Sequence, residues 1–254
     1  MSLAIYPAIK LGENQEKIRR SISRLTTGLN ILAGGTSGDF AEGLSLNAEG
    51  KSNQKVISTT KVGLDLLKTA ESALIELASL ATRLREIGIA DTDTSNSASD
   101  TAALNAEAIA VSDSIDDIVS TAKFHNLALL STSARTLATV KDADGNTTTI
   151  KTTAGITATN ISDATNSNTT ADTAIGEIQT SLGHVAGHIN SLDAYQNTAN
   201  ALASIQLESA AKLMDTNFAL ETAKLMKKTL IQKYATSMVS KANEIEENKK
   251  LLIL

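Results

Sequence analysis

Residues 188–254 read HINSLDAYQNTANALASIQLESAAKLMDTNFALETAKLMKKTLIQKYATSMVSKANEIEENKKLLIL, a stretch that contains neither glycine nor proline. As a single helix it would extend roughly 100 Å, at about 1.5 Å per residue. A compact domain has no need of such a helix, whereas coiled coils and elongated bundles are built from them. The stretch therefore predicts a helical rod that runs to the end of the chain.

The N-terminal half carries similar patterns. Apolar residues recur at spacings of three and four over residues 13–32, 43–89 and 99–123, which predicts an amphipathic helix in each range. Glycines at positions 34, 35 and 38 break the first helix, and the polar stretch 91–100 separates the other two. The stripe of the first helix consists of Ile18, Ile22, Leu25 and Leu29.

The middle of the chain, about residues 131–173, has a different character. Residues 137–140 and 147–150 flank Asp144-Gly145 and predict a β-hairpin, because Asp-Gly supplies the positive φ angles of tight turns. Residues 152–173 are rich in Thr, Asn, Ser and Asp and predict a surface loop with a strand fragment. The predicted fold class is mainly α: an elongated antiparallel helical bundle or coiled coil built from both chain termini, with one small β-hairpin region.

Composition excludes several kinds of function. The chain has 23 basic and 28 acidic residues, and this mildly acidic balance favours neither nucleic acid nor an anionic membrane as a partner. Cysteine is absent, which excludes disulfides and thiol catalysis. No apolar run approaches the ~18–20 residues that span a bilayer. The first twenty residues lack the basic region and apolar core of a cleaved signal peptide.

Residues suited to catalysis are few. His184 and His188 lie one helical turn apart, but their context HVAGH lacks the Glu that serves as general base in H-E-x-x-H zinc proteases. The glycine-rich residues 34–38 are not followed by the lysine of a phosphate-binding loop. The basic run 224–228 has no interleaved aromatic residues that would favour nucleic acid. We expect no enzyme activity and no catalytic, cofactor-binding or metal site.

Three segments carry recognisable motifs. Residues 23–31 read SRLTTGLNI and are followed by Asp39-x-Ala41-x-Gly43-Leu44. Residues 69–74, TAESAL, precede RLREI at 83–87 and Phe124-His-Asn at the end of the third predicted helix. Residues 214–221 read MDTNFALE, and LIQKYATSMVSKAN follows at 230–243. In this order, at both ends of the chain, these segments resemble the terminal motifs of bacterial flagellins.

The resemblance implies a filament subunit that assembles head-to-tail and laterally into a helical tube used for motility. It implies an inner domain of paired terminal helices, 1–42 with 212–254, and an outer rod domain, 43–211. The location implied is the extracellular flagellum, reached through the flagellar channel without a cleaved signal peptide. The implied partners are further copies of the chain, the export apparatus, an export chaperone, and the filament cap and hook-junction proteins.

The resemblance also implies surface roles for particular residues. Arg83, Ile87 and Glu107 match a face of the outer rod that packs in the filament and that a vertebrate Toll-like receptor reads. The hydroxyl-rich middle is a candidate region for glycosylation, at Thr147, Thr148, Thr169 and Thr170. Apolar residues of the terminal segments are expected to pack in the polymer: Leu25, Leu29, Leu230, Met238, Leu251, Leu252 and Leu254.

Other interpretations stay open at this point. A hook–filament junction protein shares flagellin-like ends but should not polymerise indefinitely. A free coiled-coil adhesin or phage-like fibre would need a surface anchor, and the sequence shows none. An enzyme would depend on His184 and His188 alone.

Overall fold

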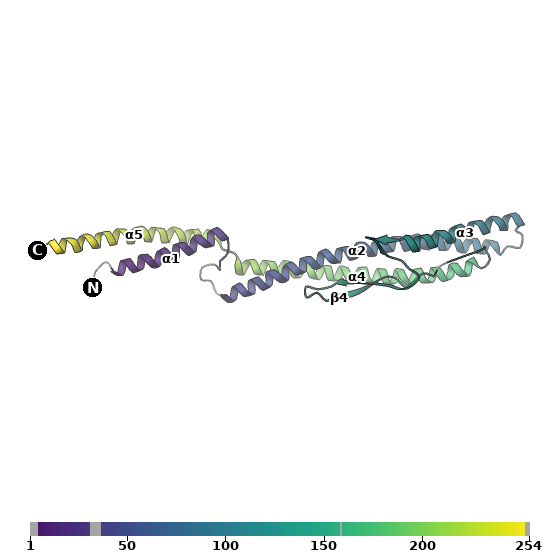
Figure 1. Ribbon diagram of the computed structural model, residues 1–254, viewed down its shortest axis with the longest axis horizontal. Helices are drawn as coiled ribbons and strands as arrows, with labels where there is room; N and C mark the ends of the chain where they lie inside the picture. Colours follow the sequence, from purple (N-terminus) through teal and green to yellow (C-terminus); the bar gives the residue numbers. More distant parts are fainter. Residues whose placement is uncertain (1–4, 31–36, 158, 252–254) are drawn as a thin grey trace. The chain divides into compact units, whose positions relative to one another are not determined.

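The computed structural model describes residues 5–30, 37–157 and 159–251, which form helices and two small antiparallel sheets (Figure 1). The fold class, mainly α with strands confined to the middle, is confirmed. The helices are α1 (Ile5–Thr27), α2 (Ser37–Asp91), α3 (Ala98–Thr121), α4 (Ser167–Met214) and α5 (Phe218–Leu251). The strands are β1 (Lys123–Phe124), β2 (Leu127–Ala128), β3 (Arg135–Val140) and β4 (Thr147–Thr153).

The chain divides into two compact units. The terminal unit consists of Met1–Lys51 with Ser204–Leu254, and the middle unit consists of Ser52–Ala203. Helices α2 and α4 contribute residues to both units. The predicted inner and outer domains refer to layers of an assembly, so the two compact units do not test their boundaries. These boundaries stay a prediction.

In the terminal unit, α1 and α5 pack against each other in antiparallel directions (Figure 1). The Asn14 side chain donates a hydrogen bond of 2.8 Å to the carbonyl of Lys228, and further along α1 Ser21 meets Glu221. The end of α4 packs against the start of α2, where Gly43 and Gly50 leave room for side chains of α4. The unit is therefore built from segments far apart in the sequence.

The prediction of one uninterrupted C-terminal helix is wrong. Residues 215–217 separate α4 from α5, because the backbone there bonds to the segment that follows α1. Asn30 donates its amide to the Met214 carbonyl at 2.8 Å, and Thr216 donates to the Gly28 carbonyl at 2.8 Å. Asn217 then begins α5, since its side chain accepts the amide of Leu220 in the manner of an N-cap.

The core of the middle unit lies between α2, α3 and α4. Leucine and isoleucine fill it because the apolar stripe of each helix faces the other two. At Gly88 the helices come so close that a Cβ would meet the α4 backbone at Asn168. The largest fully buried side chains include Leu67, Leu74, Leu77, Leu84, Ile115, Ile178 and Leu192.

The predicted hairpin forms with longer strands and a wider turn. β3 and β4 pair from Arg135 opposite Thr153 to Val140 opposite Thr147. Six residues, 141–146, connect them, and the Lys141 amide donates to the Asn146 carbonyl at 2.8 Å. Gly145 has a positive φ of 84°, but Asp144 does not, so Asp-Gly is one part of a larger loop.

The loop predicted over residues 152–173 is wrong at its C-terminal end, because α4 begins at Ser167. Thr152 and Thr153 belong to β4, in agreement with the predicted strand fragment. Polar composition concealed the start of α4, but Ala171, Ala174 and Ile178 are buried at helical spacing and pack into the core. The Ala154 amide donates to the Ser181 hydroxyl of α4 at 2.9 Å, whereas the Thr159 amide donates to Asp116 of α3 at 2.9 Å.

Candidate assembly surface

Polar side chains predominate in the interior of the α1–α5 pair. Among the described side chains of these two helices, the fully buried ones are Asn14, Ser21, Glu221 and Ala242. Ser21 donates to the Glu221 carboxylate at 2.7 Å, and the Lys228 ammonium donates to the Ser21 hydroxyl at 2.7 Å. Buried polar networks of this kind fix how two helices align more than they add to stability.

We call this network of Ser21, Glu221 and Lys228 the seam of the pair. The Glu221 carboxylate lies at its centre, and 4% of the residue is exposed. Lys224 approaches to 3.6 Å and Arg24 to 3.9 Å. Burial alone would raise the pKa of Glu221, but the hydrogen bond from Ser21 and the charges of Lys224, Arg24 and Lys228 together lower it. The carboxylate is therefore held in its charged form between the two helices.

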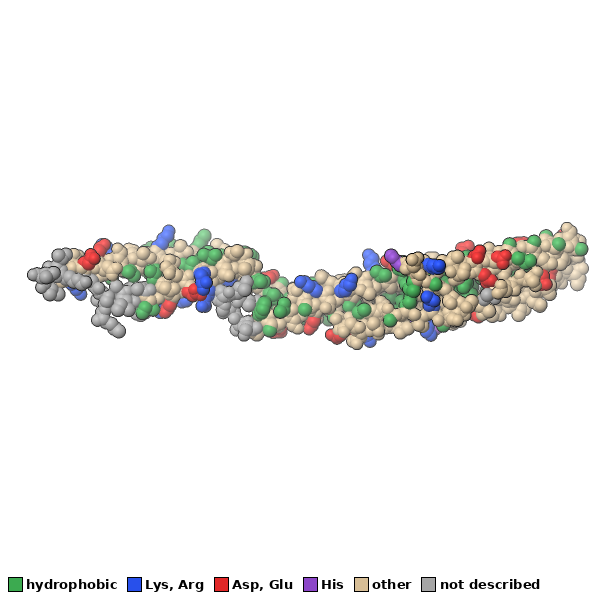
Figure 2. All heavy atoms as spheres, viewed as in Figure 1, with side chains coloured by type: hydrophobic (Ala, Val, Ile, Leu, Met, Phe, Trp, Pro, Cys, Tyr) green, Lys and Arg blue, Asp and Glu red, His purple; other side chains and the backbone are tan. Residues whose placement is uncertain are grey.

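Large apolar side chains lie on the outside of the same pair. Figure 2 shows hydrophobic side chains reaching the surface of this segment. A monomeric protein seldom exposes so many apolar groups on two neighbouring helices, and such surfaces mark contacts between proteins. We call this set the apolar surface of the pair: Ile9, Ile22, Phe218, Leu220, Met226, Leu230, Ile231, Tyr234, Met238 and Ile245.

Comparison with known proteins identifies the family of the chain. The profile of the bacterial flagellin N-terminal helical region matches residues 5–135, more than half of the chain. The chain belongs to the bacterial flagellin family. Flagellins are structural proteins, and the apolar surface of this one lies on the helices that come from both chain ends.

Individual flagellins share about half of this chain. That of Clostridium tyrobutyricum is 30% identical over 137 residues, which are 52% of this chain and 36% of the relative. That of Halalkalibacterium halodurans is 30% identical over 124 residues, 47% of this chain and 44% of the relative. The match thus spans less than half the length of either relative. The crystal structure of Bacillus cereus flagellin covers 57% of this chain and 86% of that chain, with 22% identity and a TM-score of 0.39.

The residues predicted to pack in the polymer fall into three groups in this flagellin. Leu230 and Met238 on α5 are 56% and 68% exposed and belong to the apolar surface. Leu25 and Leu29 are half-buried, and Leu29 forms a single β-bridge with Asp215. The side chains of Leu251, Leu252 and Leu254 lie outside the described residues.

The outer-rod residues do not share one surface. The Arg83 side chain donates to Glu107 at 2.8 Å, joining α2 to α3, and to Glu86 at 3.1 Å. Ile87 is only 2% exposed and belongs to the core, so its placement on a partner-facing surface is corrected. It supports the helix packing from inside. A role of Arg83 and Glu107 in filament packing or receptor recognition stays a prediction.

The candidate glycosylation residues lie in two different settings. Thr147 and Thr148 begin β4, where Thr147 is exposed and Thr148 half-buried. Thr169 and Thr170 lie in the first turn of α4, and their amides bond to the Asn166 carbonyl. Glycosylation stays a prediction at all four positions.

The two histidines that the sequence singled out lie half-buried on α4. Burial lowers the pKa of His188, and the nearby His184 and Lys151 lower it further. Among the described residues, no three or more His, Asp or Glu side chains cluster so as to hold a metal ion. In the same part of the chain, no helix is long and apolar enough to cross a membrane.

Sequence reasoning missed the polar seam. The apolar stripe of the first predicted helix includes Ile22, which is exposed, whereas the neighbouring Ser21 is buried. Ser21 lies three residues after Ile18 and four before Leu25, so the same spacing would have found the correct face. Glu221 carried a weaker signal, as an acidic residue in the first turn of α5.

Proposed function

We infer that this chain is a structural subunit of the bacterial flagellar filament, which assembles with copies of itself into an extracellular helical polymer used for motility. The observation that carries this conclusion is the α1–α5 pair, which buries charged and polar side chains between its helices and exposes its apolar surface. Flagellins form filaments of this kind, and the family membership supports the same role here.

Apolar burial supplies the driving force for such assembly. Covering apolar area yields roughly 25 cal/mol per Å². A subunit that exposes apolar side chains along two helices recovers this energy only when neighbouring subunits cover them. A head-to-tail contact that does not close into a ring then propagates as a helix. Export apparatus, export chaperone, cap and hook-junction proteins complete the proposed set of partners.

Seeded polymerisation followed by electron microscopy tests this function. The wild-type chain is expected to elongate filament seeds, and Met238→Asp is expected to stop elongation because it places a carboxylate in the apolar surface. Asn243→Asp is the matched control, since it adds the same charge at an exposed position of α5 without removing an apolar side chain. The control is expected to elongate seeds like the wild type.

Three results would contradict the proposal. A wild-type chain that stays monomeric with seeds would remove the filament function, and a chain that stops after a few subunits would indicate a junction protein. Equal elongation by Met238→Asp and the wild type would show that the apolar surface is not the contact.

A further inference from the structure

Arg135 differs from the other arginines of the chain. Its side chain forms neither an ion pair nor a hydrogen bond with any described residue, and its Nε atom is buried without a partner, as is the Nε atom of Arg24. A charged donor withheld from water and left without an acceptor costs about 1–3 kcal/mol or more. The other five are ion-paired: Arg19 and Arg20 with Glu16, Arg24 with Glu221, Arg83 with Glu86 and Glu107, and Arg85 with Asp172.

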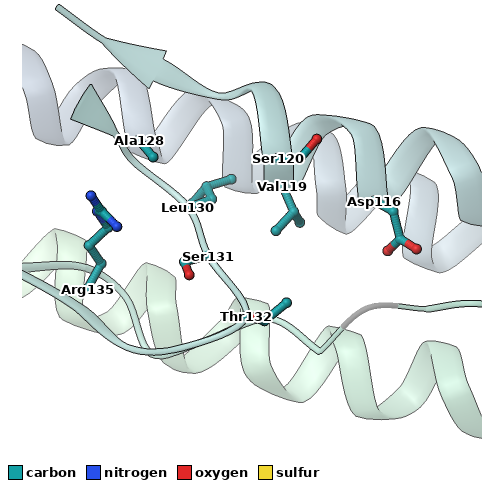
Figure 3. A pocket seen from close by; sticks show the side chains of 8 residues that line it. All are labelled: Asp116, Val119, Ser120, Ala128, Leu130, Ser131, Thr132 and Arg135. Atoms are coloured by element: carbon teal, nitrogen blue, oxygen red, sulfur yellow. The ribbon is translucent and has the colours of Figure 1, made fainter. Parts of the chain in front are cut away.

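Arg135 lines a pocket of about 420 Å³ in the middle unit. The walls come from α3, from residues 128–132 and from the start of β3. Figure 3 shows the Arg135 side chain at one end of the pocket, extending toward Ala128, with Asp116 of α3 at the opposite end. The hydroxyl groups of Ser131 and Thr132 also line it.

Backbone contacts fix the walls of the pocket in advance. Thr152 donates its hydroxyl to the Leu129 carbonyl at 2.6 Å, and the Ile156 amide donates to the Ser131 carbonyl at 3.0 Å. The pairing of β3 with β4 shifts between Arg135 and Thr136, which leaves one extra residue on β4. Bulges of this kind re-aim the neighbouring side chains. Arg135 is thus placed by the base of the hairpin.

No carboxylate of the pocket pairs with Arg135. Asp116 is the one carboxylate among its lining residues, and it accepts the Thr159 amide at 2.9 Å and the Thr159 hydroxyl at 3.2 Å. A guanidinium matches the planar carboxylate group, which accepts parallel hydrogen bonds. The Arg135 end of the pocket is therefore suited to a carboxylate that comes from outside the chain.

We propose that this pocket binds a carboxylate at Arg135, and that an acidic side chain of a second copy supplies it in the assembled protein. The source of the carboxylate rests on the proposed filament function. The chain has more acidic than basic residues, 28 against 23. Exposed carboxylates that form no ion pair with the described residues, such as Asp65, Glu76 and Asp113, offer the complementary group.

The test compares Arg135→Gln with the wild type in two measurements. The thermal midpoint of the monomer is expected to stay unchanged or to rise, because the Arg135 side chain has no partner inside the subunit and its buried Nε is costly. The critical concentration for elongation of filament seeds is expected to rise about tenfold, as for the loss of one charge-assisted hydrogen bond. The difference in critical concentration between Arg135→Gln and the wild type should shrink at high salt, because salt screens the ion pair between copies.

Arg85→Gln is the matched control. It removes the same charge from the same unit, but the partner of Arg85 is Asp172 of the same chain, at 2.8 Å. Its critical concentration should stay within about twofold of the wild type. An unchanged critical concentration for Arg135→Gln overturns the contact between copies. A fall in the monomer's thermal midpoint that accounts for the lost assembly overturns it as well, since Arg135 would then be structural.

A separate measurement distinguishes the site from the filament. Acetate is titrated into the monomer at constant ionic strength while the Arg135 side-chain N–H signal is followed by NMR. A saturable shift supports the carboxylate site even if the wild-type chain forms no filaments, in which case the proposed function fails but the site stands. The absence of any shift overturns the site.

Discussion

The middle unit and the α1–α5 pair differ in the side chains that they bury. The three helices of the middle unit bury leucine and isoleucine between them, and expose Val62, Ile75, Ile89 and Leu202. The α1–α5 pair buries a serine, an asparagine, a glutamate and an alanine and presents leucine, isoleucine and methionine outside. Both arrangements use amphipathic helices, so the direction of the apolar face is what distinguishes them.

The comparison indicates where each region obtains its stability. Apolar burial inside the middle unit is complete in the single subunit, because its core residues are already withdrawn from water. The α1–α5 pair has the same kind of side chains, but neighbouring subunits must cover them. We therefore expect the middle unit to fold independently of assembly, and the terminal helices to gain most of their stability from it.

The largest effect is expected from a substitution in the core of the middle unit. Leu74→Ala removes a side chain that is fully buried, which costs about 2–5 kcal/mol through lost apolar burial and the cavity left behind. Thermal unfolding of the monomer followed by circular dichroism measures this loss. Ile75→Ala is the matched control on the next residue, since Ile75 is 58% exposed.

Leu230→Ala tests the loss of an exposed apolar side chain in the terminal unit. Leu230 is exposed in α5, so the monomer should lose less than about 0.5 kcal/mol, the usual cost of a surface substitution. A loss as large as that of Leu74→Ala would mean that Leu230 is already packed within the subunit. The contrast between the two regions would then disappear.

The second effect concerns the close approach of α2 and α4 in the middle unit. Gly88→Ala places a methyl group against the α4 backbone at Asn168, where no flexible side chain can give way, and should destabilise the monomer by about 1–3 kcal/mol. Gly176→Ala in α4 meets nothing within 4 Å and should stabilise it by about 0.5–1 kcal/mol. Thermal midpoints that move in the same direction for both variants would show that the helices are not in close contact at Gly88.

Most of the fold could be predicted because its helices follow simple periodicity. Apolar spacing located α2 and α3 to within a few residues, since tertiary packing there agrees with the local pattern. The break at residues 215–217 escaped, because it depends on backbone bonds to Gly28 and Asn30 that lie far away in sequence. Only the Asp-Thr-Asn cluster hinted at it, as a stretch of capping residues.

The surface could be predicted less well than the fold. Leu230 and Met238 are exposed on α5, and their packing in the polymer stays a prediction. Periodicity alone cannot say whether such residues face inward or outward. Ile87, for which a surface role was expected, is buried in the core. Arg135 could not be found at all from the sequence, because its isolation depends on where every other charge lies.

A further effect tests the charged seam of the α1–α5 pair. Glu221→Gln keeps the shape of the side chain but removes its charge, and should cost the pair about 1.5 kcal/mol at neutral pH. Amide hydrogen exchange of α1 and α5 measures this loss. Glu244→Gln is the matched control, since Glu244 lies exposed on the same helix and pairs only with Lys241.

The dependence on pH separates a charged seam from a merely polar one. The folded pKa of Glu221 lies below the ordinary value of 4.5, so its contribution is complete above about that pH and is lost as the pH falls through the folded pKa. In the wild type, protection of α1 and α5 should therefore decline on acidification below pH 4.5. Exposed Glu13 and Glu16 also have lowered pKa values, through Lys10 and through Arg19 and Arg20, but they are unchanged in the variant. Glu221→Gln should accordingly start lower and decline less, and equal declines in the two proteins would assign the acid sensitivity to groups outside the seam.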